Sequence, residues 1–228
     1  MAQHSKRYKG GAAKVEARPY PLEEAVTLLL TMPKTKFDQT VELHLHLGID
    51  PKQSDQTIRG SVSLPAGVGQ TKKVIAFVDP AVPGLAEEAK KAGALEAGGD
   101  DLVAKIQGGW TDFDVAVAHP SLMPKVSKLS RILGPQGKMP SPKAGTVGPD
   151  VATLVREFAA GKVEFRNDDT GNVHAIVGKV SFDPAALKQN VEAFLEHIRR
   201  MKPASAKGIF IRSATLTATM SPGIRLAI

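Results

Sequence analysis

The amino-acid sequence predicts a two-domain α+β protein, in which residues 1–67 and 160–228 form one α+β domain and residues 68–159 form an inserted α/β domain. Two patterns lead to this prediction. Both ends of the chain combine amphipathic helices with strands in which apolar and polar residues alternate. The middle alternates short apolar runs with helical stretches, which is typical of a parallel sheet covered on both faces. With 228 residues, 42% of them hydrophobic, the chain can form one large core or two small ones.

The N-terminal part contains one helix and two strands in this prediction. The polar segment up to about Ala17 is expected to be mobile without a partner. Pro21 opens a helix with one apolar face, and Pro33 ends it. Residues 40–47 alternate between polar and apolar side chains, so they predict a strand with one buried face. Residues 58–64 have the same period and predict a second strand.

The middle of the chain changes character. Continuous apolar runs at 74–78 and 115–118 predict strands that are buried on both faces. Helices are expected at 84–92 and around 102–106, between these runs. Trp110 stands alone after two glycines and is expected to belong to the core rather than to a site.

The C-terminal part starts with a helical pattern at 151–158, which Gly161 ends because glycine readily adopts a left-handed φ. Alternation at 162–166, a turn signal at 167–171 and a further strand at 173–180 predict a hairpin.

A long helix and a last strand complete the chain. Asp183 is expected to cap the helix, with Pro184 at its first position. An apolar stripe up to Met201 marks its core-facing side. Residues 209–220 are rich in β-branched side chains and predict the last strand.

The distribution of charge favours an anionic partner. The net charge is +7, and neither residues 115–149 nor residues 197–228 contain an acid. Half of residues 134–149 are glycine or proline, so this cationic segment is expected to be a surface loop suited to a polyanion. An ordinary basic protein with solvated faces is the alternative. The charge points to nucleic acid as the partner.

Composition also excludes several classes of site. The chain has no cysteine, so disulfides, thiolate metal sites and cysteine nucleophiles are ruled out. No secretory signal and no membrane span are expected, and the protein is expected in the cytoplasm. A nucleotide- or phosphate-binding enzyme built on the central α/β domain is the alternative function. Against it, Gly67-Val68-Gly69 precedes a strand, and Met139 replaces the Ser or Thr of a phosphate loop after Lys138.

Two small groups of side chains remain as candidates. His44 and His46 share one face of a strand and, with Glu42, could ligate a metal; a polar strand face open to solvent or to a partner is favoured. Phe37 lies beside Lys36 before the same strand, where a ring can stack on a base while the cation meets phosphate. A buried Phe that anchors the strand is the equal alternative. Because only 5% of residues are aromatic, a multi-base stacking platform is not expected. The absence of a zinc-finger, basic-helix or double-stranded-RNA-binding pattern favours recognition of folded RNA by shape, phosphate and ribose contacts over sequence reading in a major groove.

Several motifs occur in order over nearly the whole chain. They are Lys36-Phe37-Asp38, Gly48-Ile49-Asp50-Pro51, residues 128–135 and 139–147, Phe165-Arg166-Asn167-Asp168 with Thr170-Gly171, and Thr219-Met220. Together they closely resemble the bacterial L-one family of large-subunit ribosomal proteins. The resemblance implies a terminal α+β domain with an inserted Rossmann-like domain. It also implies a protein without enzymatic activity, cofactor or membrane partner.

The resemblance further implies partners. The protein would bind large-subunit ribosomal RNA at the mobile stalk near the tRNA exit site, and other parts of the ribosome. It would assist release of deacylated exit-site tRNA and repress translation of its own operon mRNA. Hydroxyl groups suit this task, since they can both donate to and accept from ribose 2′-OH groups. Carried over by motif, the RNA-binding surface comprises Lys36, Phe37, Thr40, Glu42, Arg166, Asn167, Asp168, Thr170, Gly171, His174, Ser213, Thr219 and Met220.

Two positions depart from the family pattern. Asp169 stands where the family commonly has Lys, and Ser221 where it commonly has Gly. Asp169 adds an acid at the expected RNA rim, and Ser221 puts a β-carbon where either close backbone approach or a left-handed residue is wanted. Both are left out of the predicted site. The cationic loop 134–149 is left out as well, because the resemblance assigns it to the inserted domain.

Overall fold

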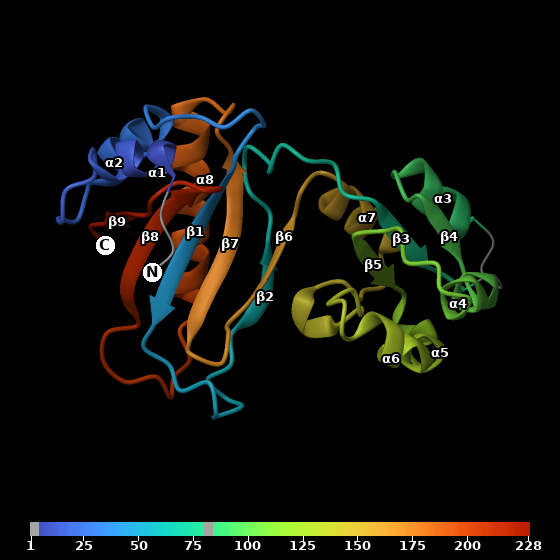
Figure 1. Cartoon of the computed structure of the whole chain (residues 1–228). Helices are drawn as coiled ribbons and strands as arrows, with labels where there is room; N and C mark the ends of the chain where they lie inside the picture. Colours follow the sequence, from blue (N-terminus) through green and yellow to red (C-terminus); the bar gives the residue numbers. More distant parts are fainter. Residues whose placement is uncertain (1–4, 80–83) are drawn as a thin grey trace. The chain divides into compact units, whose positions relative to one another are not determined.

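The structure, a computed structural model, describes residues 5–79 and 84–228 of a mixed α/β protein. Its contacts form two compact units (Figure 1). Unit 1 contains Met1–Gly69 and Val163–Ile228, and unit 2 contains Gln70–Lys162.

Unit 1 is built on a four-stranded antiparallel sheet in which segments from both ends of the chain lie side by side. The order is β7 (Asn172–Lys179), β1 (Thr40–Leu47), β8 (Ile211–Ala218) and β9 (Ile224–Leu226). The central strand β1 has the bounds predicted from its alternation. β7 and β8 confirm the predicted strands, while β9 is a short edge strand that the sequence pattern does not reveal.

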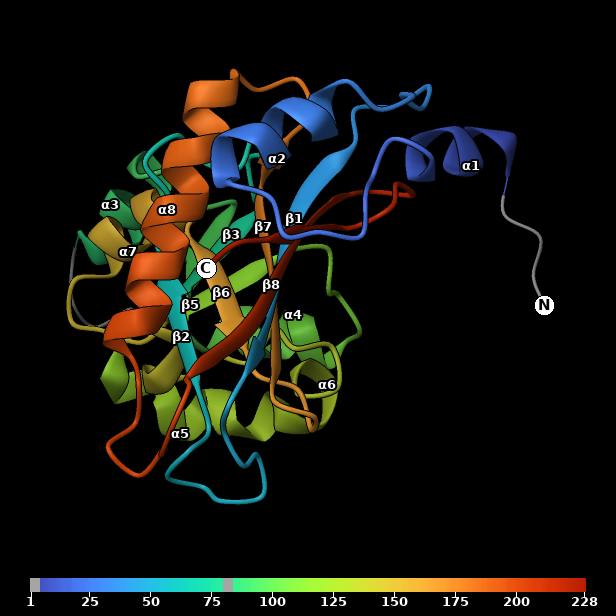
Figure 2. The same ribbon diagram turned by 90° about the vertical axis from the view of Figure 1, so that its left-hand side faces the viewer.

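Helices cover one face of this sheet. α2 (Leu22–Leu30) and α8 (Pro184–Arg200) pack against each other and against the strands, as Figure 2 shows. Every second residue of β1, from Val41 onward, is buried beneath them. Both helices confirm the sequence pattern. Asp183 occupies the N-cap position of α8, but its side chain makes no cap; its backbone carbonyl accepts from Leu187 instead.

A second, two-stranded antiparallel sheet belongs to the same core. It pairs β2 (Arg59–Val62) with β6 (Val163–Arg166), confirming both predicted strands with shorter bounds for β2. The Phe165 ring of β6 packs edge-on against Phe194 of α8, with 5.3 Å between centroids. This contact attaches the small sheet to the long helix.

Unit 2 contains a three-stranded parallel sheet. β3 (Val74–Phe77) lies between β4 (Glu96–Gly98) and β5 (Val115–Ala118). All four residues of β3 are buried, as expected of a strand covered on both faces.

Two groups of helices cover the two faces of this sheet. One core cluster includes residues of α4 (Asp100–Gln107), α5 (Met123–Val126) and α6 (Ser130–Leu133). The other includes residues of α3 (Leu85–Lys91) and α7 (Val151–Ala159). Three short 3-10 turns complete the unit, at Pro120–Leu122, Ser127–Leu129 and Pro142–Ala144. These two covers confirm the α/β pattern of the middle of the chain.

Trp110 packs against the first of these clusters, with Lys105 Nζ 4.2 Å from its ring centroid and Phe113 beside it. Its placement confirms that it contributes to packing.

The N-terminal segment differs from the prediction of a mobile tail. It forms a helix, α1 (Lys6–Ala12), with Ser5 at the N-cap accepting from the Tyr8 amide. The segment lacks an apolar stripe, so helical periodicity could not reveal it. Its stability comes from contacts with distant parts of unit 1, described below.

Candidate nucleic-acid interface

The face of the unit 1 sheet opposite the helices carries three cross-strand rows of side chains, which are polar except for the exposed Ile176. Each row takes one residue from β7, one from β1 and one from β8, because paired residues on neighbouring strands point to the same side. These side chains are half-buried or exposed, whereas the residues that lie between them along each strand are buried. We call this surface the open face; its rows are Asn172–His46–Ser213, His174–His44–Thr215 and Ile176–Glu42–Thr217.

The open face is held together by side-chain hydrogen bonds. The Nδ1 atoms of His44 and His174 are 2.8 Å apart, so one of them donates and the other accepts. His46 Nδ1 lies 2.8 Å from Oδ1 of Asn172. His44 Nε2 lies 3.6 Å from the Glu42 carboxylate. The side chains of β1 and β7 therefore form one fixed polar surface.

This surface is not strongly cationic. Burial lowers the pKa of His44, and the neighbouring His174 lowers that pKa further, while Glu42 acts in the opposite direction. The neutral form of His44 is thus favoured at pH 7. The open face offers neutral donors and acceptors, which suit ribose hydroxyls and base edges more than bare phosphate.

The hairpin between β6 and β7 continues the open face at one end. Asp168 Oδ1 accepts from the amides of Thr170 (2.9 Å) and Asn172 (2.7 Å) and from the Thr170 hydroxyl (2.8 Å). These bonds, that from the Asn172 amide above all, hold the pKa of Asp168 well below its usual range. The Asn172 amide group also donates to the Thr170 hydroxyl at 2.7 Å. Asp168 and Thr170 are thus joined to the rows through Asn172.

The opposite end of the open face is formed by the start of β1 and the end of β8. The Thr40 amide donates to the Thr219 hydroxyl at 3.2 Å, and Lys179 Nζ donates to the Thr40 hydroxyl at 2.8 Å. Gln39 donates to the Thr219 carbonyl at 2.7 Å and to the Ser221 hydroxyl at 3.1 Å. Predicted site residues from positions 40 and 219 therefore lie against each other.

Two apolar side chains are exposed near this end. Phe37 is 51% exposed and Met220 is 67% exposed. The exposure of Phe37 rules out a buried anchor of the strand. Met220 has φ 60°, and within the described part of the chain every other residue with a positive φ is a glycine. A strained, exposed residue of this kind is typical of a functional site.

Two predicted site residues turn away from solvent. Asn167 is only 6% exposed: its Oδ1 accepts from the Ile58 amide and its Nδ2 donates to the Asp168 carbonyl. Gly171 is buried with φ +81°, and its carbonyl accepts from the Leu47 amide. Both shape the hairpin, and the Asn167 side chain is engaged within unit 1.

The remaining predicted positions are accessible. Lys36 and Arg166 are exposed, as is Asp169, the position where the family pattern has a cation. At Ser221 the expected difficulty does not arise, because the left-handed residue of the turn is Met220. The Ser221 hydroxyl instead helps to hold Gln39.

The cationic window of unit 2 is partly engaged within the unit. Lys125 pairs with Asp100 at 2.8 Å. Lys138 donates to the Thr111 carbonyl at 2.9 Å. The other three cations of residues 115–149, which are Lys128, Arg131 and Lys143, are exposed.

Several open-face residues were not in the predicted site. The alternation along β1, β7 and β8 does reveal which of their side chains share a face. It does not reveal which strands pair or in what register, so the rows could not be assembled from sequence. The added residues are His44, His46, Asn172, Ile176, Thr215 and Thr217.

A metal at His44 and His46 finds no support in the geometry. Across residues 5–79 and 84–228, no three His, Asp or Glu side chains are grouped so that they could hold a metal ion. In the same residues no helix is both long and apolar enough to cross a membrane.

Comparison with known proteins gives a consistent result. Residues 29–222 match the family model described as the ribosomal protein L1p/L10e family. The large ribosomal subunit protein uL1 of Kosmotoga olearia is 51% identical over 227 residues, covering 99% of this chain and 97% of that protein. The uL1 protein of Thermus thermophilus is 48% identical over 228 residues, covering 99% and 98%. These matches give no support to a nucleotide- or phosphate-binding enzyme. The chain belongs to the ribosomal protein L1p/L10e family.

Proposed function

We propose that this protein is a structural component of the large ribosomal subunit and binds folded ribosomal RNA through the open face of unit 1. The family and the names of its relatives support the ribosomal role, and that role is not enzymatic. A ribosomal component of this kind works in the cytoplasm. More specifically, we propose that the RNA it binds is the ribosomal RNA of the mobile stalk near the tRNA exit site.

One observation carries the RNA-binding proposal. Polar side chains from both ends of the chain converge on one continuous surface, from the Asp168 hairpin through the histidine rows to Thr219. Hydroxyls and imidazoles along this surface can exchange hydrogen bonds with ribose 2′-OH groups. Phe37 adds a ring that can stack on a base, and Lys36 adds a charge for phosphate.

We assign direct contact with RNA to the accessible residues of the predicted set. Asn167 and Gly171 act indirectly, by holding the hairpin. The direct contacts are Lys36, Phe37, Thr40, Glu42, Arg166, Asp168, Thr170, His174, Ser213, Thr219 and Met220.

Three further parts of the proposal concern organisation and partners. Units 1 and 2 are two domains, the second being a Rossmann-like insertion close to the predicted range 68–159. The protein assists release of deacylated tRNA from the exit site. It also represses translation of its own operon mRNA by binding a mimic of the stalk RNA.

Filter binding tests the central part. A stalk fragment of large-subunit RNA is compared with a mismatched hairpin of equal length and charge. Specific recognition predicts that the stalk fragment binds tighter by at least about a hundredfold at one salt concentration. Equal affinity for the two RNAs would contradict specific recognition.

A further inference from the structure

Helix α1 contacts two separate segments that flank one end of the open face. Arg7 Nη2 donates to the Met220 carbonyl at 2.6 Å, and Nη1 donates to the Pro33 carbonyl at 3.3 Å. Met220 belongs to the β8–β9 turn, which reaches α1 in Figure 2. Pro33 belongs to the loop that leads to Phe37. One guanidinium thus joins the two segments that present the exposed apolar side chains.

A second contact lies one helical turn further along the same face of α1. Gly11 is buried, and a β-carbon placed there would lie 3.2 Å from Pro222 Cδ and 3.8 Å from Pro33 Cδ. Residues four apart in a helix lie on one side, so Arg7 and Gly11 dock the same face of α1. Gly10, by contrast, has open space where its β-carbon would be.

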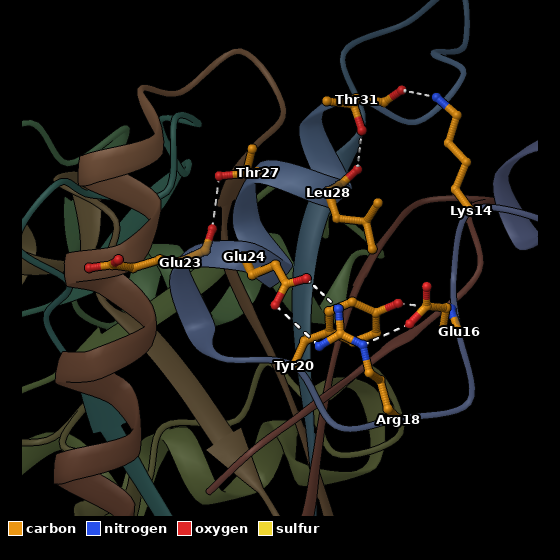
Figure 3. A pocket seen from close by; sticks show the side chains of 9 residues that line it. All are labelled: Lys14, Glu16, Arg18, Tyr20, Glu23, Glu24, Thr27, Leu28 and Thr31. Carbon is orange, nitrogen blue, oxygen red and sulfur yellow. Dashed lines mark hydrogen bonds and ion pairs between the residues drawn. The ribbon is translucent and has the colours of Figure 1, made fainter.

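The chain after α1 is fixed to α2 by several polar contacts, which Figure 3 shows around a pocket of about 460 Å³. Lys14 Nζ donates to the Thr31 carbonyl at 2.9 Å. Arg18 forms an ion pair with Glu24 at 2.5 Å, and its guanidinium lies 4.2 Å from the centroid of the Tyr20 ring. These contacts hold the segment that leads from α1 to α2.

The β8–β9 turn needs such support. Met220 has a left-handed φ that costs a side chain of this type free energy, and most of its surface is exposed. Within the turn, the Ser221 amide donates to the Ala218 carbonyl at 2.8 Å. The bond from Arg7 fixes the orientation of the Met220 carbonyl, and therefore of the strained peptide.

We infer that Arg7 is a positioning residue for RNA binding: together with Gly11 it docks α1 so that the Met220 turn and the Phe37 loop are held in their binding geometry. This inference rests on the proposed RNA-binding function. α1 precedes residues 29–222, which match the family model, so this support lies outside the matched region. Arg7 acts through the protein backbone, because both of its side-chain hydrogen bonds within the described residues are to carbonyl groups.

Two matched pairs of variants test the inference by filter binding to the stalk fragment. Arg7→Lys keeps the charge but loses the planar fork that joins two carbonyls, and Lys6→Arg, which also keeps the charge, is its control on the same helix. Gly11→Val places a side chain against Pro222 and Pro33 and so pushes α1 away from them. Gly10→Val makes the same change where there is open space. We expect Arg7→Lys and Gly11→Val to weaken binding about fivefold. Gly10→Val should bind as the wild type does.

The salt dependence and the local dynamics separate positioning from other roles. A positioning residue releases no counterions, so Arg7→Ala should lower affinity without changing the slope of log K against log salt. Amide exchange at Ser221 should become faster in Arg7→Lys and Gly11→Val while the thermal midpoint stays near that of Gly10→Val. A slope reduced by about 0.9 in Arg7→Ala, with normal binding by Arg7→Lys, would show a phosphate contact and overturn the inference.

Binding by the wild-type protein shows whether a negative result contradicts the positioning role alone or the proposed RNA-binding function as well. Specific wild-type binding that survives in both Arg7→Lys and Gly11→Val would overturn the positioning role and leave the proposed function intact. A wild type that does not prefer the stalk fragment over the equal-charge hairpin would overturn both.

Discussion

The two main sheets of this protein differ in what covers them. The parallel sheet of unit 2 has helices against both faces, and every residue of β3 is buried. Within residues 5–79 and 84–228, the antiparallel sheet of unit 1 has helices against one face only, and the rows of its open face are polar except for Ile176. A sheet covered on both sides has no strand face left for a partner. This difference supports the proposal that recognition belongs to unit 1, although the longest acid-free window lies in unit 2.

The charge composition of the sequence thus suggests unit 2 as the RNA-binding part, whereas the arrangement of side chains in the structure suggests unit 1. The cations of residues 115–149 are what first suggests a polyanion, yet Lys125 and Lys138 are engaged within unit 2. On the open face, few groups are charged, but their positions are fixed by mutual hydrogen bonds. Preorganised neutral groups can distinguish one folded RNA from another, whereas mobile cations add affinity for any RNA.

The largest expected effect sharpens the contrast between the two faces of β1. Leu43→Ala should lower the free energy of unfolding of unit 1 by about 2–5 kcal/mol, because Leu43 is fully buried. His44→Ala, one residue along on the open face, should cost less than about 1 kcal/mol but should weaken RNA binding. Urea denaturation and filter binding measure the two quantities. Equal losses of stability would contradict the assignment of the two faces.

The salt dependence of binding tests whether the phosphate contacts are made by unit 1 or by unit 2. If about five phosphates are contacted, log K against log salt should have a slope of about −4, using the duplex-DNA coefficient. Lys36→Ala should make this slope shallower by about 0.9. Arg131→Ala, an exposed cation of unit 2, should leave it unchanged. The opposite pattern would indicate that the RNA binds unit 2. An affinity that does not depend on salt would show that no phosphates are contacted.

The smallest expected effect concerns pH. Because the pKa of His44 is lowered on folding, the unfolded chain binds its proton more readily once the pH falls below about 6.5, the ordinary value. Stability should therefore fall as the pH decreases from 7 to 5. His44→Gln should lose less stability than the wild type over this range, as urea denaturation at each pH can show. A larger loss in His44→Gln would mean that the shift has the opposite sign.

The regular elements were predictable where local pattern and tertiary burial agree. Strand β1 has the predicted bounds because its side chains alternate without interruption. Helix α1 and strand β9 were not predictable, since both are short and depend on distant partners. Strand β4, Glu96–Gly98, is composed of small residues and an acid, which carry no strand signal.

The sequence predicted which residues belong to the site better than it predicted how those residues are arranged. The family motifs supplied residues from three distant parts of the chain, and strand alternation supplied the polar faces. Neither could reveal that Asn167 bonds inward, since its side-chain partners are chosen by the fold. The left-handed φ of Met220 was equally hidden, because methionine disfavours it and only a held turn imposes it.

The most direct test of the account compares one substitution at each candidate surface. Met220→Asp places an acid beside the open face at a position where aspartate tolerates the left-handed backbone, so its effect reports on the RNA contact. We predict that Met220→Asp and Thr219→Val weaken binding to the stalk fragment by about tenfold or more, and Lys138→Ala by less than about twofold. The reverse order would place recognition in unit 2 and contradict the central claim.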